Sequence, residues 1–338
     1  MSPRVLIIGC GSIGTRHLRN MALLGVKDFV LCDPSGPSLK RASEGLLDPL
    51  LKTDFNDAIK EKVNAAVIAA PSSMHLDMAV ELAKKGVHLL IEKPLSDSLL
   101  NTERLKTIVG KKRVAAMMAM CYRFHPVFLS LRDRLGRNAI GAVYHVNYYG
   151  GHYLPDWHPN ADYRKEYASQ ARLGGGVVLT SIHGLDNLRW LFGEVSSAFS
   201  FVDRVGSLEM DVEDIAIAVF RMKSGVYVNW QTDFLQRANQ HRMVVTGSEG
   251  TIRCDFIEGV IETYCAGSRK WEAEKVAYDV NTMYVEEMRH FLSCVERNAS
   301  PDIDVEEGIK TLKLALEVKR AYGAEAKACS NQCKCSHG

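Results

Sequence analysis

Short apolar runs alternate with helical patterns along the first third of the chain. Residues 5–8 form an apolar, β-branched run that ends at Gly9, and apolar positions then recur at spacings of three to five residues over 13–24, which is typical of an amphipathic helix. A second apolar run at 29–33 completes a strand–helix–strand unit. Further strands are predicted at 65–70, 88–91 and 114–120, and a helix at 75–85. This alternation predicts an α/β fold with a doubly wound parallel sheet and helices on both faces.

The pattern changes after about residue 122, where strand-like runs follow one another with turn signals between them. Consecutive strands predict a mostly antiparallel sheet, with hairpin turns at 223–225 and 248–250. Helical patterns remain at 182–192, 283–297 and 305–322. The second part of the chain is therefore predicted to be an α+β domain with a large open sheet and helices against it. Its predicted strands are 143–149, 198–204, 215–221, 226–232, 241–246, 251–255 and 260–264.

The two patterns divide the 338 residues into two domains of ordinary size. The parallel-sheet domain is expected at 1–121 and the α+β domain at 122–325. The last segment, 326–338, is predicted to be a solvated, disordered tail because of its Ser, Asn and Gly content. A zinc site is the alternative, since the tail holds soft ligands, but its loops are short and no metal is predicted. These ligands are Cys329, Cys333, Cys335 and His337.

Composition and charge favour a small molecule as the main partner. Hydrophobic residues make up 46% of the chain and charged residues 24%, as in an ordinary soluble globular protein. With 42 Lys and Arg against 40 Asp and Glu, the formal net charge of +2 gives no field that would attract nucleic acid or an anionic membrane. No apolar run approaches the ~18 residues of a membrane span. Six cysteines stand singly among apolar segments, which is typical of free buried thiols in a reducing compartment, so a cytoplasmic location is expected.

A G-x-G-x-x-G sequence follows the first predicted strand and opens the first predicted helix, which is the context of a dinucleotide-binding turn. The first glycine permits the tight turn, the second lets the pyrophosphate approach the backbone, and the third lets the helix pack on the strand. Asp33 lies 19 positions after Gly14, close to the ~20-residue offset at which a carboxylate binds the ribose hydroxyls. An acid there repels a 2′-phosphate, so NAD is favoured over NADP. The predicted cofactor-binding residues in this region are Gly9, Gly11, Ser12, Ile13, Gly14 and Asp33.

Two further strand ends are expected at the same cleft, because ligands of open α/β sheets bind beyond the carboxyl ends of the strands. A lysine that ends an apolar strand beside a nicotinamide ring is suited to acid/base chemistry. The alternative is an ordinary strand-end lysine with a buried stem and a solvated ammonium. The residues expected at the cofactor from these strand ends are Ala70, Pro71, His75, Glu92 and Lys93.

The chain resembles the glucose-fructose oxidoreductase, inositol dehydrogenase and rhizopine-catabolism family (Gfo/Idh/MocA) over nearly its whole length. Glu92-Lys93-Pro94 is the most specific match. The other matches, in chain order, are the glycine turn 9–14, Pro71-x-x-x-His75, Tyr122-Arg123-Phe124-x-Pro126, Gly174-Gly175-Gly176 with His183 downstream, Gly247-x-x-Gly250 and a late helix over 287–297.

This resemblance implies a Rossmann domain followed by an α/β domain whose large sheet serves oligomerisation, so a homodimer or homotetramer is expected. It also implies NAD(P)-dependent oxidation or reduction at a carbon of a sugar, cyclitol or related polyol. Lys93 stands where the family has the lysine that binds the reacting hydroxyl. His183 stands where the family has a histidine that shares proton transfer, and the two are the candidate catalytic residues.

One position departs from the family pattern. The family usually places an Asp three or four residues before the histidine, and here Thr180 stands at the shorter spacing. Threonine hydrogen-bonds a hydroxyl, but it cannot accept a proton at neutral pH or stabilise an imidazolium by charge. Three alternatives are open: His183 works without a carboxylate, Asp186 supplies one from the same helix face, or the usual reaction is altered.

A segment dense in polar aromatics, 152–167, follows the first strand of the second domain. Such rings stack on sugar faces, while Asp, Arg and His supply directional hydrogen bonds. Its Tyr-Leu-Pro-x-Trp and Asp-Tyr-Arg elements resemble a branch associated with nonulosonic acid and surface-sugar pathways. The alternative is an ordered loop that packs against a neighbouring subunit. The predicted substrate-binding residues are Lys93, Tyr122, Arg123, Trp157, His158, Tyr163, Arg164, Thr180 and His183.

The sequence therefore predicts a cytoplasmic NAD-dependent dehydrogenase that acts on CH–OH groups of a sugar or sugar derivative. A hydrolase or epimerase that holds NAD tightly and oxidises its substrate transiently is the first alternative. A catalytically silent NAD-binding sensor is the second, and the threonine at position 180 keeps it open.

Overall fold

The computed structural model describes residues 3–159 and 161–322, which form two compact units. Residues 3–124 and 279–312 make up the first unit, and residues 125–278 and 313–322 make up the second. The predicted tail, 326–338, with its cysteines and histidine, lies outside the described residues.

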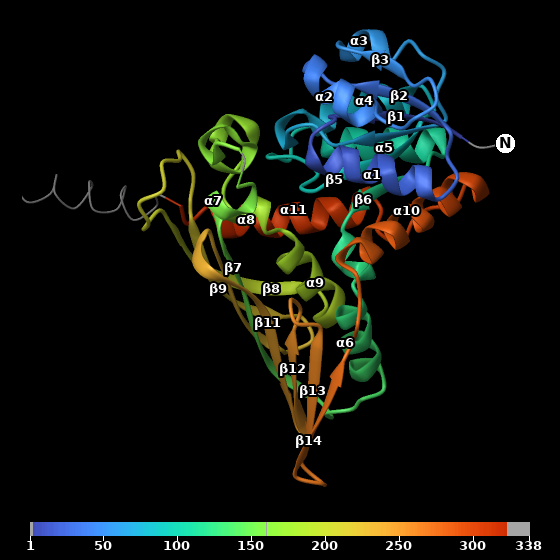
Figure 1. The fold of residues 1–338 in the computed structure, drawn as a ribbon. Coiled ribbons are helices and arrows are strands. Elements are labelled where there is room, and N and C mark those ends of the chain that lie inside the picture. Colours follow the sequence, from blue (N-terminus) through green and yellow to red (C-terminus); the bar gives the residue numbers. More distant parts are fainter. Residues whose placement is uncertain (1–2, 160, 323–338) are drawn as a thin grey trace, which may run out of the picture. The chain divides into compact units, whose positions relative to one another are not determined.

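The first unit is built on a six-stranded, fully parallel sheet in the order β3-β2-β1-β4-β5-β6, which is the strand order of a dinucleotide-binding Rossmann fold. Figure 1 shows α1, α4 and α5 beside the strands of this sheet. The predicted doubly wound α/β domain is thereby confirmed. The strands are β1 (Arg4–Ile8), β2 (Asp28–Cys32), β3 (Leu50–Lys52), β4 (Ala65–Ile68), β5 (His88–Glu92) and β6 (Ala116–Ala119). The helices are α1 (Ser12–Leu23), α2 (Gly36–Ser43), α3 (Phe55–Ala58), α4 (His75–Lys84), α5 (Thr102–Lys112) and α10 (Val280–Arg297), with single 3-10 turns at Ser72–Met74 and Cys121–Phe124.

The register of the central strands β1, β4 and β5 brings their carboxyl ends to one edge of the sheet. Apart from Arg4, His88 and Glu92, their residues are apolar and buried, because helices cover both faces of a parallel sheet. In the register of the sheet, Ile8 of β1 pairs with Ile68 of β4, and Ile68 pairs with Ile91 of β5. The segments that follow these three residues therefore leave the sheet at one edge.

The second unit holds an eight-stranded sheet in the order β14-β13-β12-β11-β7-β10-β9-β8. β7 and β10 pair in parallel and the other neighbours are antiparallel, which confirms the predicted, mostly antiparallel sheet. The strands are β7 (Val143–Tyr153), β8 (Val195–Asp203), β9 (Ile215–Met222), β10 (Tyr227–Asp233), β11 (Leu235–Gly247), β12 (Gly250–Asp255), β13 (Val260–Cys265) and β14 (Lys270–Lys275). The helices are α6 (Pro126–Gly136), α7 (Leu154–Trp157), α8 (Val177–Thr180), α9 (His183–Phe192) and the end of α11 (Val305–Lys319), with 3-10 turns at Tyr163–Lys165, Tyr167–Ser169 and Ala171–Leu173.

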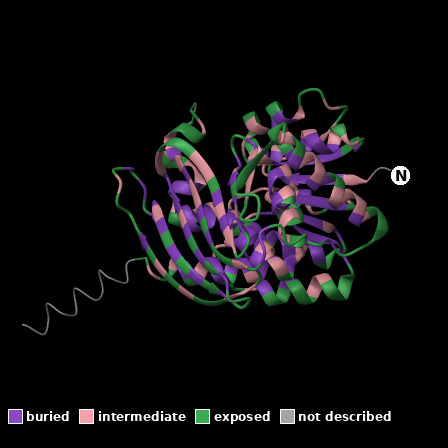
Figure 2. Cartoon of the chain, turned by 90° about the horizontal axis from the view of Figure 1, so that it is seen from below, coloured by how far each residue is buried: buried purple, intermediate pink, exposed green. Residues whose placement is uncertain are grey.

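One face of the large sheet is covered and the other is open. Along β9, buried and exposed residues alternate with the two-residue period of a half-buried strand, and Figure 2 shows this alternation as purple and green bands across the sheet. Figure 1 shows α6 and α9 along one face. Apolar side chains also stand on the open face, where Phe199 is 65% exposed.

The structure differs from the sequence analysis in several elements. The predicted second domain ran continuously over 122–325, whereas α10 clusters with the first unit, where Asn281 donates to the side chain of Asn20 at 2.8 Å. The short edge strand β3 was not predicted, nor was β14, whose six residues are all exposed and give no apolar pattern. Helices α2, α5 and α6 were also missed.

No helix among the described residues is long and apolar enough to cross a bilayer. Within the same residues, no cluster of His, Cys, Asp and Glu could hold a metal ion. The six cysteines there are free thiols, and Cys265 is exposed, contrary to the expectation that all six are buried.

Candidate functional site

The glycine turn between β1 and α1 has the geometry of a phosphate cradle. Gly9 has a φ of +87°, and a Cβ there would lie 2.4 Å from the carbonyl oxygen of Ala69. A Cβ at Gly14 would lie 1.8 Å from the carbonyl oxygen of Gly9, so helix and strand touch at this point. A Cβ at Gly11, in contrast, would meet nothing within 4 Å. No side chain caps the start of α1, which begins at Ser12, so its first N–H groups and the space at Gly11 together suit an anionic pyrophosphate.

Asp33 lies directly after β2 and holds the same turn. Its carboxylate accepts hydrogen bonds from the backbone N–H of Cys10 at 2.7 Å and of Ser35 at 2.8 Å. A carboxylate has about four acceptor positions, so two of them are left for ribose hydroxyls. Burial, and then the charge of Asp33, raise the pKa of the Cys10 thiol to about 12, which keeps this cysteine of the turn protonated.

The end of β5 places a carboxylate beside Lys93. Glu92 is buried, its Oε1 lies 2.6 Å from Nε2 of His17, and its Oε2 accepts the backbone N–H of Lys93 at 3.0 Å. Burial opposes ionisation of this group, but the hydrogen bond with His17 and the charge of Lys93 outweigh it and lower the pKa of the Glu92 carboxyl. The strand end therefore carries a fixed negative charge that orients the backbone of the lysine.

His75 joins two of the predicted segments. It is fully buried, with Nδ1 2.8 Å from the carbonyl oxygen of Pro94 and Nε2 2.7 Å from that of Ala70. Burial lowers the pKa of its imidazole, and a neutral ring donates through one nitrogen only. The neutral ring therefore donates to one of the two carbonyls and packs against the other, so His75 lies between the Pro71 segment and the end of β5.

Two residues from the 3-10 turn after β6 were predicted to bind substrate. Tyr122 is partly exposed there, while Arg123 is buried and its guanidinium donates to Glu307 of α11 at 3.4 Å. The charge of Arg123 is therefore used inside the first unit.

Sequence reasoning missed a buried acid in the first unit. Glu287 of α10 is fully buried, and neither of its carboxyl oxygens has a hydrogen-bond partner among the described residues. Burial, and then the charge of Glu92, raise its pKa well above the usual range. Only its place in the matched helix 287–297 marked it in the sequence.

In the second unit, Thr180 and His183 flank the junction of two helices. Thr180 is the last residue of α8 and is buried, and His183 is the first residue of α9 and is partly exposed. Asp186, the alternative carboxylate, is buried on α9. Asn187 lies one turn after His183, is fully buried, and has no partner for its amide among the described residues. The sequence analysis did not select Asn187 as a site residue, since nothing in the family motif marks it.

The aromatic segment presents one ring to solvent. Trp157 is 40% exposed and stacks on His158 with an angle of 2° between the ring planes. His158 is in turn fixed by Glu166, whose carboxylate lies 2.8 Å from its Nδ1. The rings at the start of the segment therefore form a braced platform.

Two other predicted residues of this segment are engaged within the unit. Arg164 donates from Nε to Asp162 at 2.8 Å and from a terminal nitrogen to Glu209 at 3.3 Å. The hydroxyl of Tyr163 accepts the backbone N–H of Glu209 at 3.1 Å. Their polar groups thus stabilise the segment itself. Trp157, whose ring is exposed, is the better candidate for stacking on a substrate.

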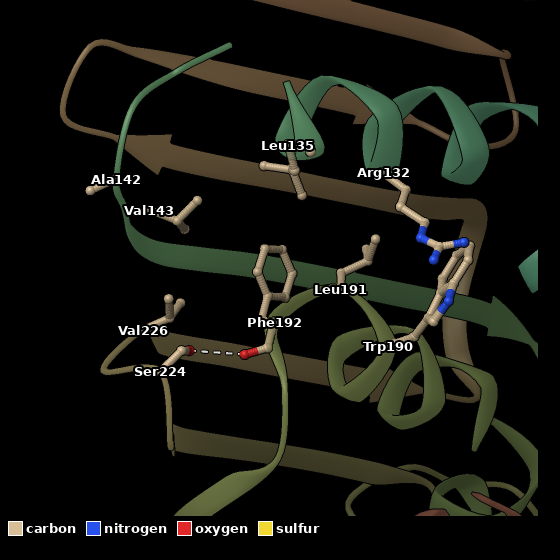
Figure 3. Close-up of a pocket in the computed structure, with 10 residues that line it drawn as sticks. Arg132, Leu135, Ala142, Val143, Trp190, Leu191, Phe192, Ser224 and Val226 are labelled. Atoms are coloured by element: carbon tan, nitrogen blue, oxygen red, sulfur yellow. Dashed lines mark hydrogen bonds between the residues drawn. The ribbon is translucent and has the colours of Figure 1, made fainter. Parts of the chain in front are cut away.

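Two hollows lie away from all these residues. One, of about 480 Å³, lies between α6, the start of β7 and the end of α9 (Figure 3). There the guanidinium of Arg132 covers the ring of Trp190, and the Ser224 hydroxyl donates to the carbonyl of Phe192. The other, of about 960 Å³, is lined by residues such as Arg4 and His88 at the amino ends of strands in the first unit. Neither is lined by a predicted site residue, and the second lies at the sheet edge opposite the glycine turn.

Comparison with known proteins assigns both units. Residues 3–120 match the model of an oxidoreductase family with an NAD-binding Rossmann fold, and residues 128–253 match the GFO/IDH/MocA C-terminal domain. The chain is 27% identical to a myo-inositol 2-dehydrogenase from Thermotoga maritima over 94% of this chain and 96% of that protein. It is 25% identical to an NAD⁺-dependent scyllo-inositol 2-dehydrogenase from Bacillus subtilis over 94% of this chain and 98% of that protein. A levoglucosan dehydrogenase solved with NADH and levoglucosan shares the fold, with a TM-score of 0.84 at 17% identity over 95% of this chain and 97% of that one.

Proposed function

The chain belongs to the GFO/IDH/MocA family of NAD-binding oxidoreductases, and from this membership we propose that it transfers a hydride between NAD and a hydroxyl-bearing carbon of a sugar, cyclitol or sugar derivative. The observation that carries the proposal is the shared edge of the parallel sheet. The glycine turn at Gly11 and the Glu92–Lys93 strand end leave the sheet at the same edge, because Ile8, Ile68 and Ile91 are in register. A nucleotide cradle and a candidate acid/base group thus lie at the carboxyl ends of neighbouring strands, where such folds bind ligands.

The residues of the first unit fit NAD. Backbone N–H groups at the start of α1 would hold the pyrophosphate, and the unused acceptor positions of Asp33 would bind the ribose hydroxyls and repel a 2′-phosphate. Bound NAD supplies the hydride acceptor at its nicotinamide ring. The protein's share is alignment and proton transfer.

Lys93 and His183 are proposed to share the proton chemistry. In the oxidative direction, the amine form of Lys93 would accept the proton of the substrate hydroxyl, and the ammonium so formed would donate a hydrogen bond to the oxygen of the product carbonyl. Glu92 fixes the backbone of the lysine. His183 is the second proton-transfer group. Thr180 would hydrogen-bond a substrate hydroxyl, but it supplies no charge to the imidazole of His183.

Sugar recognition is proposed for the braced platform of Trp157 and His158. A stacked ring that stays 40% exposed offers an apolar face for the C–H face of a sugar. Inositol, levoglucosan and related polyols are the substrates in the names of the similar proteins, and we place the substrate of this chain in that chemical class.

We also propose that a second copy of the chain covers the open face of the large sheet, giving a homodimer or homotetramer. Adjacent strands expose apolar side chains there, since Phe199 pairs with Val219 and Phe201 with Ile217, and a contiguous apolar patch of this kind marks an interface. A cytoplasmic location is proposed on the free thiols of the six described cysteines. Light scattering of the wild-type protein and of Phe199→Lys tests the proposed oligomer, because a charge on this face should lower the molar mass of the particle in solution.

A substrate screen and two variants test the function. Sugars, cyclitols, uronates and nucleotide sugars are offered with NAD⁺ while NADH absorbance is followed. With the substrate so found, Lys93→Met should lower turnover by about 100-fold or more, the scale of a lost general acid/base, while NADH still binds. His183→Asn should slow turnover and remove one limb of the pH–rate profile.

A matched control is Lys84→Met, which removes an exposed lysine of α4 that pairs with Glu81 and should leave turnover unchanged. Near-normal turnover in Lys93→Met would refute the mechanism. Cofactor retained through purification with no net NADH formation would favour the hydrolase or epimerase alternative. Tight NAD binding without turnover of any sugar would favour the silent sensor.

A further inference from the structure

A buried ion pair contacts the triglycine turn, Gly174–Gly176, that precedes α8. Glu213 is fully buried, and its Oε2 lies 3.2 Å from the ammonium of Lys319 at the end of α11. The same ammonium donates to the carbonyl oxygen of Gly175 at 2.9 Å. Lys319 therefore joins the last helix of the unit to the backbone of the turn.

The turn is shaped around the carboxylate. Gly176 has a φ of +104°, and a Cβ there would lie 2.2 Å from Oε1 of Glu213. The backbone N–H of Val177 donates to the carbonyl of Glu213 at 3.1 Å, and the N–H of Val178 donates to its Oε1 at 3.3 Å. Glu213 thus satisfies the first N–H groups of α8, which a helix start otherwise leaves without partners.

The geometry of the turn is passed on to His183 within a few residues. Thr180 N–H donates to the carbonyl of Gly176 at 3.0 Å, Ser181 N–H to that of Val177 at 2.9 Å, and Gly184 N–H to that of Ser181 at 3.0 Å. These bonds tie the turn, α8 and the start of α9 into one hydrogen-bonded path. A displacement at Gly176 would move Thr180 and His183 with it.

We propose that Lys319 and Glu213 are positioning residues that set the orientation of His183 through the triglycine turn. This inference rests on the proposed catalytic role of His183. Burial raises the pKa of the Glu213 carboxyl and Lys319 opposes that effect. The pair is a structural element because its contacts are made to the backbone of the turn and of α8. The bond from Lys319 to Gly175 is the contact that carries the positioning.

A double-mutant cycle tests the proposal. Lys319→Met should lower kcat about tenfold or more with little change in the KM for NAD, because a misplacement of ~1 Å costs up to about 100-fold. In the His183→Asn background the same substitution should have almost no further effect, because both changes remove one function. Independent, multiplying effects of the two substitutions would overturn the inference.

The double variant Glu213→Gln/Lys319→Met separates positioning from stability. It removes the unpaired buried charge and keeps an acceptor for the Val178 N–H, so thermal stability should recover relative to Lys319→Met. The bond to Gly175 is still missing, so kcat should stay low. Recovery of kcat together with stability would show a purely structural pair. If Lys319→Met does not fold, two other variants test the positioning role. The double variant should have a low kcat, and Lys319→Arg, which keeps the charge, should retain most of kcat.

Arg189→Met is the matched control. Arg189 lies on α9 six residues after His183, its side chain is buried, and it donates to Glu194, beyond the end of that helix, at 2.6 Å. Its loss should lower stability while kcat falls less than twofold. A fall as large as that of Lys319→Met would mean that any buried ion pair of the unit affects turnover. Normal turnover in His183→Asn alone would reject the role of His183 itself, which is a separate result.

Discussion

Two glycine-rich turns open helices in the two units, and they use the space at their glycines in opposite ways. A Cβ at Gly11 would meet nothing within 4 Å, whereas a Cβ at Gly176 would lie 2.2 Å from the carboxylate of Glu213. The first turn keeps open space at Gly11, where we propose that the cofactor binds. The space of the second turn is filled by a carboxylate of the protein itself.

The carboxylates that hold the two turns differ in exposure and in how much of their hydrogen-bonding capacity is used. Asp33 is partly exposed and accepts two backbone N–H groups, so it keeps acceptor positions for a ligand. Glu213 is fully buried and paired with Lys319, so its capacity is used within the fold. The two carboxylates thus differ in exposure, and the exposed one is the one for which we propose ligand binding.

The largest effect is expected from Gly176→Ala. The added Cβ would overlap Glu213 in a backbone conformation that favours glycine, so unfolding in urea should show a loss of about 2–4 kcal/mol. Gly193→Ala is the control, because Gly193 has a φ of +91° but open space around its Cβ position, and it should cost only about 1 kcal/mol. Equal losses in the two variants would mean that the carboxylate does not fill the turn.

Gly11→Val should leave stability almost unchanged but weaken cofactor binding. Gly11 has an extended backbone with a φ of −73°, which valine adopts readily, and its Cβ would enter open space. Stability should change by less than ~0.5 kcal/mol, while the fluorescence titration of NADH should show at least about tenfold weaker binding. Unchanged NADH affinity would remove the cradle from the cofactor site.

Asp33→Ser combined with Pro34→Arg should sharpen the contrast between the two carboxylates. The exposed carboxylate is replaced by a cation that accepts a 2′-phosphate, so the ratio of NAD to NADP affinity should shift toward NADP by about tenfold or more. Titration of both cofactors against wild-type and variant protein measures the ratio. Tighter binding of NADP than of NAD by the wild-type protein would sink the assignment of Asp33.

Glu287→Gln compares an unpaired buried acid with the paired Glu213. Because the folded pKa of Glu287 is raised, the folded chain keeps a proton that the unfolded chain releases above its ordinary pKa of 4.5. Its contribution to stability is complete below that value and is lost as the pH rises through the folded pKa.

The glutamine variant does not titrate, so above pH 5 the wild type should lose stability relative to it by about 1.4 kcal/mol per pH unit until the folded pKa is reached. Urea unfolding at several pH values measures this. A difference that does not change with pH would show that Glu287 ionises in the fold much as it does in the unfolded chain.

Sequence reasoning identified the NAD-binding Rossmann domain because its signals are local. The glycine turn, Asp33 and Glu92-Lys93 follow apolar strands directly, and strands of a parallel sheet carry their ends to one edge. The charges of Arg123 and Arg164 are engaged with Glu307, Asp162 and Glu209. Asp162 is only two residues from Arg164, but Glu307 and Glu209 are distant in sequence, so the ion pairs with these two could not be anticipated.

The sequence by itself determined the two kinds of sheet, the NAD-binding turn and the family, because periodicity and short motifs depend on neighbours a few residues apart. Only the tertiary structure decided that α10 packs with the first unit, that Gly11 keeps its space and Gly176 does not, and that Glu213 meets Lys319. These facts depend on which side chain from far along the chain arrives beside a given backbone position. A residue such as Glu213 is 106 positions from Lys319, and close packing of the folded chain alone brings the two charges within 3.2 Å.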